Sequence, residues 1–500
     1  MNKSDHLSDI LRRIVSVLFI LSLGWMIIAA FLSGAEKYAA AFPILAIAMT
    51  TAFVLLHRPI CRALQHCSSK KLTIAGLLLA AAGFSLMLVI AFALKNDIRD
   101  NWDYGLVFSS AATIAKGGPL TNVDYFARYG NNGLFLLILS RFLRIVFLVS
   151  GNENIYFLLD CSIVLNCILI VCSILIFSWC MRALYSVQAG FLTECILLLM
   201  SPLYLYATFT YTDVYGLLPA ALIVLSLTKS LNALKNRKSA AGIIWCILTG
   251  LFAAAGLLIK GTLVIFLIAA LLTFLLAPET SGKRIRMTIL YVVTAGLTVL
   301  GANHVTGSFL KQYGVTEEMR EKEAFSSAHF LMMAMNPATA GQFNSGDVQF
   351  SQSFPDSAAR KSADIQELKN RLSEMGLSGT LHHIFIVKAK YIYGTGTAGA
   401  PNYIMRKPMA DNWAIRFFGK NSLFFEATLL CQTMLFDLIL VISIFRLAKK
   451  WDGSGLSFFL RICVTGIFLF FCIWESHPRY TFVFLPLLAM MGAESIEQSV

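Results

Sequence analysis

Charged residues are scarce in this sequence. Asp, Glu, Lys and Arg together make up 14% of its 500 residues, whereas hydrophobic residues make up 57%. A soluble globular domain has about 25% charged residues. The scarcity of charge therefore excludes an ordinary soluble domain. It predicts a polytopic membrane protein, for which the number of domains does not follow from chain length.

Motifs for binding soluble nucleotides are also lacking. The sequence has no Gly-rich phosphate loop, no Walker signature and no dinucleotide-binding pattern. A group-transfer enzyme with this sequence would therefore need an activated donor other than a soluble nucleotide.

Disulfide and metal patterns are lacking as well. Nearly all of the eleven cysteines lie in apolar stretches or in one basic segment with Cys61 and Cys67, which fits no disulfide framework and no zinc spacing. His329, His382 and His383 match no ligand motif either. We predict no metal-binding residues. The cofactor stays undetermined, because a divalent metal is compatible with the sequence but not required by it.

The net charge of +13 at pH 7 would suit a protein that binds nucleic acid. Most of the basic residues, however, lie in short segments between apolar runs, as the positive-inside rule requires of a membrane protein. We therefore predict no nucleic-acid partner, and we expect membrane lipids around the chain.

The apolar segments predict membrane spans, each of which takes about 20 residues. Twelve such segments lie near residues 11–32, 38–57, 72–94, 155–180, 189–210, 214–233, 241–259, 262–277, 287–304, 424–446, 457–474 and 480–494. We expect the first to be retained, because no small-residue cleavage site accompanies it. Strongly basic segments alternate with loops in which basic residues are fewer. This alternation predicts a multi-pass plasma-membrane protein with both termini cytoplasmic and the active site extracytoplasmic.

The predicted fold class is an all-α polytopic membrane protein with about twelve transmembrane helices, outer-face interfacial helices and a small α-rich extracytoplasmic domain. Residues 305–422 form that domain, because they are polar and contain the amphipathic stretch ELKNRLSEMG and several turn signals. Before it lie two extra N-terminal spans with a basic loop (1–71) and a transmembrane core (72–304). The C-terminal spans follow it (423–500).

The first outer loop, residues 96–154, is the one part of the first third of the chain that we expect to carry polar chemistry. Tyr104–Lys116 and Asn132–Val149 are predicted helices within it. Arg141 and Arg144 interrupt the apolar second helix, which favours a helix lying in the membrane interface. The alternative is a helix that crosses the membrane, which would invert the sidedness of the loops that follow.

Three carboxylates are candidates for chemistry. Asp100 and Asp103 lie just beyond the outer end of the third predicted span, where a carboxylate can serve as general base. The alternative is a solvated carboxylate that closes a helix. Asp213 lies between two apolar segments, and an ionisable group at membrane depth indicates a functional site. It could equally cap the helix that begins near Val214.

Three cations are candidates for binding a lipid phosphate. Lys260 lies between two apolar runs, where it suits a phosphate at the membrane surface. A lysine whose head reaches out to water is an equally good interpretation. Arg128 and Arg479 have the same character, and arginine binds phosphate through two parallel hydrogen bonds.

Taken together, these motifs resemble the GT-C superfamily of integral-membrane glycosyltransferases. The nearest likeness is to the branch of the protein O-mannosyltransferases and aminoarabinose transferases, in its Gram-positive bacterial form. NWDYGLVFSSAATIAKGG resembles the family's acidic-motif helix, although Tyr104 stands where the family usually has Glu. YFARYGNNG, YTDV, LLIKGT and WESHPRYTFVFLPLL resemble later motifs, in the family's order.

The resemblance implies a glycosyltransferase that moves a hexose or pentose, with inversion, from a polyprenyl-phosphate sugar lipid. The acceptor would be a cell-envelope molecule: a glycan such as a cell-wall glycan, a teichoic acid or a protein. Carried onto these motifs, the catalytic residues are Asp103 and Asp213. The substrate-binding residues are Asp100, Arg128, Tyr129, Lys260, Arg479 and Tyr480.

Three other functions stay open. One is a polysaccharide polymerase or ligase of similar architecture. Another is a lipid flippase or transporter, which would place charges near the middle of the membrane within broken helices. The third is a membrane assembly protein without catalysis.

Overall fold

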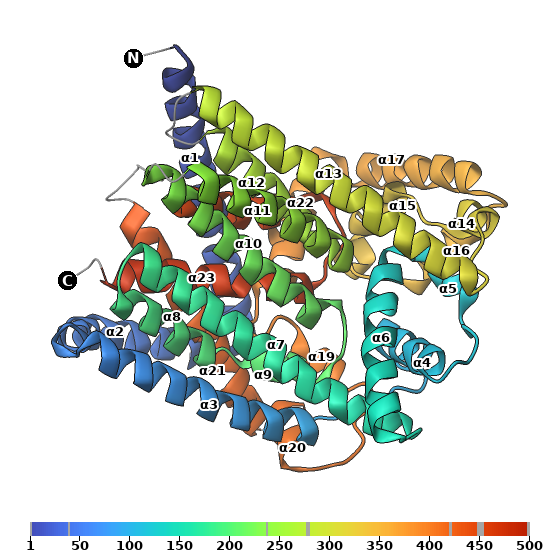
Figure 1. Cartoon of the computed structure of the whole chain (residues 1–500), viewed down its shortest axis with the longest axis horizontal. Helices are drawn as coiled ribbons and strands as arrows, with labels where there is room; N and C mark the ends of the chain where they lie inside the picture. The colour runs from blue at the N-terminus through green and yellow to red at the C-terminus, as the bar shows by residue number, and fades with distance from the viewer. Residues whose placement is uncertain are drawn as a thin grey trace.

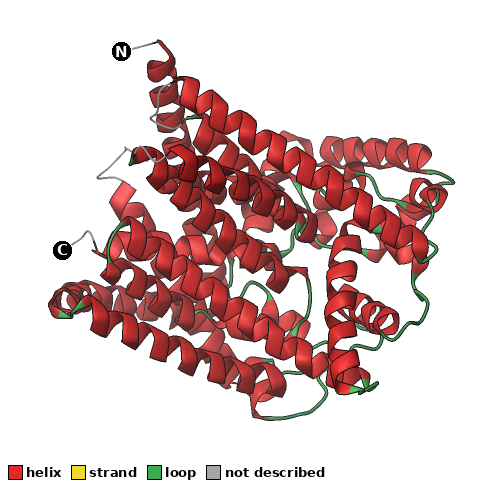
Figure 2. Ribbon diagram, in the orientation of Figure 1, coloured by secondary structure: helices red, strands yellow, loops and turns green. Residues whose placement is uncertain are grey.

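The computed structural model describes residues 3–38, 41–236, 239–276, 281–419, 423–447 and 455–497. Within these ranges the regular structure is helical, and the one β-bridge joins Asn96 to Pro408 (Figure 2). The predicted all-α fold class is thereby confirmed.

Long helices occupy the positions of the predicted spans. They are α1 (Lys3–Tyr38), α2 (Ala41–His66), α3 (Ser69–Ala93), α7 (Ile155–Leu184), α10 (Thr212–Lys235), α11 (Ser239–Ile259), α13 (Ser281–Gln312), α21 (Leu423–Leu447) and α22 (Leu456–Ile473). Shorter helices take the remaining positions: α8 (Val187–Leu199) with α9 (Ser201–Leu205), α12 (Val264–Leu275) and α23 (Leu485–Glu497). By length and composition, nine helices of the described chain can cross a membrane, or ten if the pair bent by 62° at 187–208 counts as one span. These nine include residues 130–150 and do not include α21.

Side-chain caps explain where several helices begin. Asn154 accepts a hydrogen bond from the Tyr156 backbone N–H at the start of α7, and Ser186 caps α8 in the same manner. Such caps satisfy backbone N–H groups that the first helical turn leaves free. Ser68 likewise caps α3 directly after α2 ends at His66. The predicted basic loop at 57–71 is therefore mostly helix, which corrects the sequence interpretation.

The long helices run side by side, and the helices of the segment 96–154 lie at one end of them (Figure 1). The beginning of α1 and the end of α23 lie at the left in this view. The helices α4 (Asp103–Ala115), α5 (Val123–Arg128) and α6 (Gly133–Ser150) lie at the right. The beginning of α1 and the end of α23 therefore share one end of the bundle, and the helices α4, α5 and α6 lie at the other.

The helix α6 stands across the direction of α3 and α7 (Figure 1). Its Arg144 donates a hydrogen bond to the backbone oxygen of Ala115, at the end of α4 (2.8 Å). Residues 130–150 are nevertheless apolar enough to cross a membrane. The orientation agrees with the predicted interfacial helix, and the composition permits the alternative.

The predicted extracytoplasmic domain consists of helices and loops. α13 continues past the predicted boundary at 305 to Gln312. After it come α14 (Glu317–Glu323), α15 (Ser327–Ala334), α16 (Ser345–Gln352), α17 (Ser357–His382), the π-helical turn η5 (His383–Lys388), α18 (Ala389–Tyr393), α19 (Ala400–Ile404) and α20 (Trp413–Phe418). The stretch ELKNRLSEMG lies in α17, as predicted. The predicted turn MNPATAG contains Ala340 and Gly341 with positive φ.

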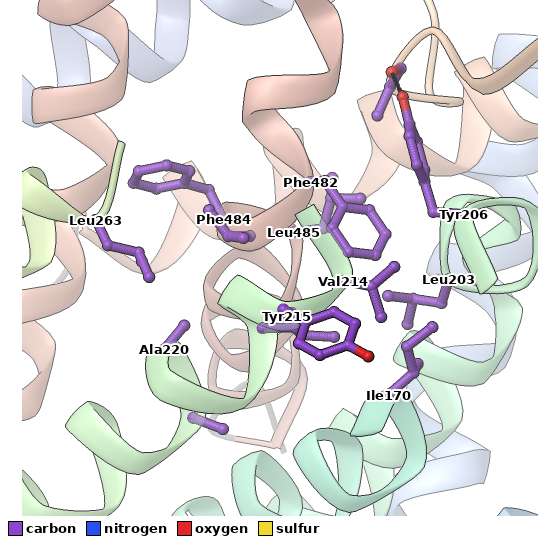
Figure 3. Packing of buried hydrophobic residues seen from close by; sticks show 14 of the residues in the cluster. Ile170, Leu203, Tyr206, Val214, Tyr215, Ala220, Leu263, Phe482, Phe484 and Leu485 are labelled. Carbon is purple, nitrogen blue, oxygen red and sulfur yellow. Dashed lines mark hydrogen bonds between the residues drawn. The ribbon is translucent and has the colours of Figure 1, made fainter. Parts of the chain in front are cut away.

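Buried apolar side chains from several helices pack together around the first turns of α10 (Figure 3). Val214 of α10 and Phe482 of the 3-10 helix η6 (Pro478–Phe484) are fully buried among them. The Tyr206 ring packs 4.9 Å from that of Phe482, and its hydroxyl donates to the Ala398 backbone oxygen (2.8 Å). Because Val214 follows Asp213 directly, this packing helps to hold Asp213 in place.

Candidate functional site

Ends of separate helices come together at the polar end of the bundle. Asp103 is the first residue of α4, Asp213 lies in the first turn of α10, and Lys260 follows α11. A Cβ on Gly216 would lie 3.0 Å from the Lys260 Cβ, so glycine lets Lys260 approach α10 closely. The candidates Asp213 and Lys260, far apart in the sequence, are thereby brought into contact.

Lys260 and Asp213 form a buried ion pair. The Lys260 Nζ lies 2.5 Å from Asp213 Oδ1, and the two side chains are 6% and 2% exposed. The Asp213 Oδ2 has no hydrogen-bond partner within the described ranges. The cap position of α10 is taken by Tyr211, without a side-chain cap bond. The structure therefore contradicts both alternatives: Asp213 is not a helix cap, and the Lys260 head does not reach water.

Arg479 lies in an aromatic cage made of Trp102, Tyr211, Tyr403 and Tyr480. Its guanidinium carbon is 4.8, 5.3, 5.6 and 5.5 Å from these ring centroids, respectively. Arg479 is 7% exposed, and its Nε and Nη1 have no hydrogen-bond partner in the described part of the chain. The Lys260 Nζ lies 4.6 Å from the Tyr480 ring centroid, so both cations contact the same ring.

Asp103 joins this group through Tyr211. The Tyr211 hydroxyl donates to Asp103 Oδ2 (3.3 Å) and contacts Asn132 Oδ1 (3.5 Å). Asp103 is only half-buried, unlike Asp213, and can therefore be reached from outside. Asp103, Asp213, Lys260, Arg479 and Tyr480 thus form one cluster.

Glu475 and His477, which sequence reasoning missed, also belong to the cluster. Glu475 accepts a hydrogen bond from the Tyr480 hydroxyl, and burial raises the pKa of its carboxyl group. The nearby Asp103 charge raises the Glu475 pKa further, whereas Arg479 lowers it. His477 Nδ1 lies 3.1 Å from the Tyr403 hydroxyl, and burial lowers the pKa of His477. Glu475 and Asp103 are thus close enough for the charge of one to influence the other.

Burial raises the pKa of Tyr129 to about 12, and the charge of Asp103 raises it further, as expected for a residue near the cluster. Arg128, by contrast, forms an ion pair with Glu323 of α14 (2.9 Å) and lies over the Phe325 ring. The residue predicted to hold phosphate is therefore engaged by the domain at 305–422.

Asp100 lies outside the cluster as well. Its carboxylate is 95% exposed, and its nearest cation is Lys407 at 3.8 Å. Its φ of 46° places it in the left-handed region, in the turn that precedes α4. The N-cap of α4 is Trp102, without a side-chain bond, so Asp100 does not close this helix.

The described residues offer no set of metal ligands. Among them, no three His, Cys, Asp or Glu side chains are grouped so that they could hold a metal ion. We therefore derive no step through a metal.

Two proteins of known structure are among those to which this chain is similar. One is the archaeal oligosaccharyltransferase AglB from Archaeoglobus fulgidus, in complex with an inhibitory peptide and a dolichol-phosphate. It has 13% identity and a TM-score of 0.42, over 83% of this chain and 50% of that one. The other is ArnT from Cupriavidus metallidurans bound to undecaprenyl phosphate, with 12% identity and a TM-score of 0.35, over 84% of this chain and 78% of that one. The chain spans about half the length of the archaeal protein.

No curated protein matches the sequence. A family model does match, over residues 7–500, and its description is "conserved hypothetical integral membrane protein". Since this match covers nearly the whole chain, which also carries at least nine apolar helices of spanning length, the protein is a multi-pass membrane protein. It belongs to the family of conserved hypothetical integral membrane proteins.

Proposed function

We propose that the protein is a membrane glycosyltransferase that moves a sugar from a polyprenyl-phosphate donor to a cell-envelope acceptor at the outer face of the plasma membrane. The Arg479 guanidinium is the observation that supports this most strongly. It is buried in the aromatic cage with two unpaired nitrogen donors. Leaving such donors unpaired costs about 1–3 kcal/mol or more. Phosphate oxygens are acceptors that match the planar guanidinium.

The lipid phosphate would bind at Arg479, with Lys260 as a second cation nearby. Lys260 is already paired with Asp213. It therefore supplies electrostatic support, while Arg479 supplies the free hydrogen-bond donors. The aromatic rings of the cage exclude water, which strengthens both interactions. Arg128 is paired elsewhere and has no part in this site.

Asp103 would act as general base. It takes the proton of an acceptor hydroxyl, whose oxygen then forms a bond to the anomeric carbon of the sugar. The bond from that carbon to the phosphate oxygen breaks at the same time, and the polyprenyl phosphate leaves as an anion. Arg479 and Lys260 stabilise the charge that develops on it. A single displacement of this kind inverts the configuration. The acceptor class is a glycan, a teichoic acid or a protein.

A lipid flippase is the second candidate. The span at 187–208 is bent by 62°, and broken helices often carry the substrate site in transporters. The charged cluster, however, lies at helix ends rather than within a broken helix. A flippase would move polyprenyl-phosphate sugar between leaflets without consuming it, whereas a transferase releases free polyprenyl phosphate.

The test uses the purified full-length protein in lipid nanodiscs, with undecaprenyl phosphate as the probe. Arg479→Gln should weaken binding by about 10-fold or more, because charged hydrogen bonds are lost. Arg479→Lys should retain part of the affinity. Arg128→Gln is the matched control and should bind as the wild type does. Equal affinity of Arg479→Gln and wild type would contradict the phosphate site. A purified polyprenyl-phosphate sugar then serves as donor in a transfer assay with cell-envelope acceptor.

A further inference from the structure

The π-helical turn η5 is fixed by three outside contacts. His383 Nε2 lies 3.0 Å from the Ala334 backbone oxygen of α15. The Trp25 indole N–H of α1 donates to the Phe385 backbone oxygen (2.7 Å), and the Lys388 ammonium donates to the Trp474 backbone oxygen (2.8 Å). A π turn carries one extra residue and commonly marks a functional position. This six-residue turn is thus hydrogen-bonded to α1, to α15 and to the segment after α22.

The segment that Lys388 contacts is the site segment 474–480, which contains Glu475, Arg479 and Tyr480. Lys388 is fully buried, and burial lowers its pKa to about 8. A hydrophobic side chain of similar length would fill this position without the cost of desolvating an ammonium. Packing alone therefore does not explain a lysine here, whereas the bond to the residue before Glu475 does.

Further contacts tie the same segment to the domain at 305–422. The Ser476 backbone N–H donates to the Gly341 backbone oxygen (2.7 Å). The Trp474 ring stacks on Phe330 with centroids 5.1 Å apart. The position of the site segment thus depends on this domain, and Lys388 supplies the charged hydrogen bond among these contacts.

α1 belongs to the two extra N-terminal spans, for which the sequence indicates no role. It packs on α18, α21 and α22. Besides its hydrogen bond, Trp25 places its ring edge-on to Phe385, with centroids 5.9 Å apart. A second contact, the ion pair of Glu36 with Lys390, lies two residues beyond Lys388 and does not involve the site segment.

We propose that Lys388 and Trp25 are positioning residues: α1 holds the π turn in place, and the turn holds segment 474–480 so that Glu475 and Arg479 stay in the site. The expected effect on catalysis rests on the proposed glycosyl transfer. The expected effect on the position of segment 474–480 does not.

The test compares Lys388→Met and Trp25→Phe with the matched control Lys390→Met in the purified full-length protein. Hydrogen–deuterium exchange of peptides covering 474–480 should rise about 10-fold in Lys388→Met, because one charged hydrogen bond is lost. The rise should be smaller in Trp25→Phe and absent in Lys390→Met. Lys388→Gln keeps a donor and should restore part of the protection. Sugar-transfer kcat should fall about 10- to 100-fold in Lys388→Met, because misplacement of a site by 1 Å has effects of this size.

A double-mutant cycle separates positioning from general destabilisation. Trp25→Phe should add little to Lys388→Met, because both act through one turn, but should combine independently with Lys390→Met. Wild-type exchange of 474–480 in Lys388→Met and Trp25→Phe would overturn the inference, and so would an equal effect of Lys390→Met. If the exchange changes as expected but wild-type protein transfers no sugar, the proposed function fails and the positioning role stands. If Lys388→Met does not fold, Trp25→Phe and Lys388→Gln carry the same test.

Discussion

The Lys260 ammonium and the Asp213 carboxylate lie 2.5 Å apart, and both side chains are almost completely buried. The two residues stand at the ends of different helices and meet beside the aromatic cage of Arg479. Burying two charges costs several kcal/mol per ion, and a close partner offsets that cost. The pair therefore stabilises the fold at the place where the proposed phosphate binds. Effects on stability and on binding must be measured separately.

The first prediction concerns the effect of this ion pair on stability. Lys260→Met should destabilise the protein by roughly 3–5 kcal/mol, because the buried Asp213 carboxylate loses its partner. The double variant Lys260→Met/Asp213→Asn should recover most of this loss. Thermal unfolding of the purified variants in detergent measures both effects. If the double variant is no more stable than Lys260→Met, the ion pair does not account for the burial of these residues.

Variants of Lys260 also report on donor binding. Lys260→Arg should keep part of the affinity for undecaprenyl phosphate, because the positive charge is retained. Lys260→Ala and the double variant should both bind it more weakly than the wild type. Wild-type affinity in the double variant would remove Lys260 from the phosphate site and leave Arg479 as its cation.

The second prediction concerns Asp103. Asp103→Asn keeps the acceptor for the Tyr211 hydroxyl but cannot take a proton, so it should reduce transfer by about 10²–10⁴-fold at normal protein level. Asp100→Asn is the control, and its exposed carboxylate predicts nearly full activity. The assay measures transfer from a purified polyprenyl-phosphate sugar to cell-envelope acceptor at equal protein. Full activity in Asp103→Asn, or a larger loss in Asp100→Asn, would place the catalytic carboxylate elsewhere.

Much of the fold follows from the sequence, because a helix that spans the bilayer requires a long apolar segment. Nine of the predicted spans contain one long helix each, and the other three contain shorter helices. Asp213 and Lys260 also stand out in the sequence, because isolated charges between apolar segments are rare. Their mutual contact could not be predicted, since it depends on how α10 and α11 pack.

The aromatic cage could not be predicted for a different reason. Trp102, Tyr211 and Tyr403 come from three distant segments, and aromatic residues are common throughout a membrane protein. Nothing in the local pattern around Tyr403 distinguishes a cage residue from part of a turn. Arg128 shows the converse: a cation in a suggestive motif pairs instead with Glu323, a partner far along the chain.

The third prediction tests which side of the membrane the site faces. A tag inserted at Ser345 should be accessible in intact cells, and a tag near Asn236 should not, because basic loops stay in the cytoplasm. Ser345 begins α16 at the site end of the bundle, and Asn236 follows the far end of α10 (Figure 1). Labelling with a membrane-impermeant reagent, before and after cell lysis, measures accessibility. The reverse pattern would invert the proposed orientation.

The fourth prediction concerns the buried hydrogen-bond chain His329–Ser351–Asp364. The Ser351 hydroxyl donates to Asp364 Oδ1 (2.6 Å), so its oxygen accepts from His329 Nδ1 (2.7 Å). Burial lowers the pKa of His329 to about 4. The cations Arg360 and Arg371 lower it further, while Asp347 opposes them. The imidazole therefore stays neutral in the folded protein at pH values where it is charged in the unfolded chain.

Because the folded pKa of His329 lies below the unfolded value near 6.5, the unfolded chain binds more protons between pH 6.5 and pH 4. Stability should therefore fall as the pH falls through this window, by roughly 2 kcal/mol between pH 6.5 and pH 5. In His329→Gln, which can still hydrogen-bond to Ser351 but cannot titrate, this contribution should vanish. Burial also raises the pKa of Asp364, which stabilises the fold on acidification, but Asp364 is present in both proteins and cancels in their comparison. The measurement is the unfolding temperature of both purified proteins as a function of pH. Parallel curves would show that the pKa of His329 is the same in the folded protein as in the unfolded chain.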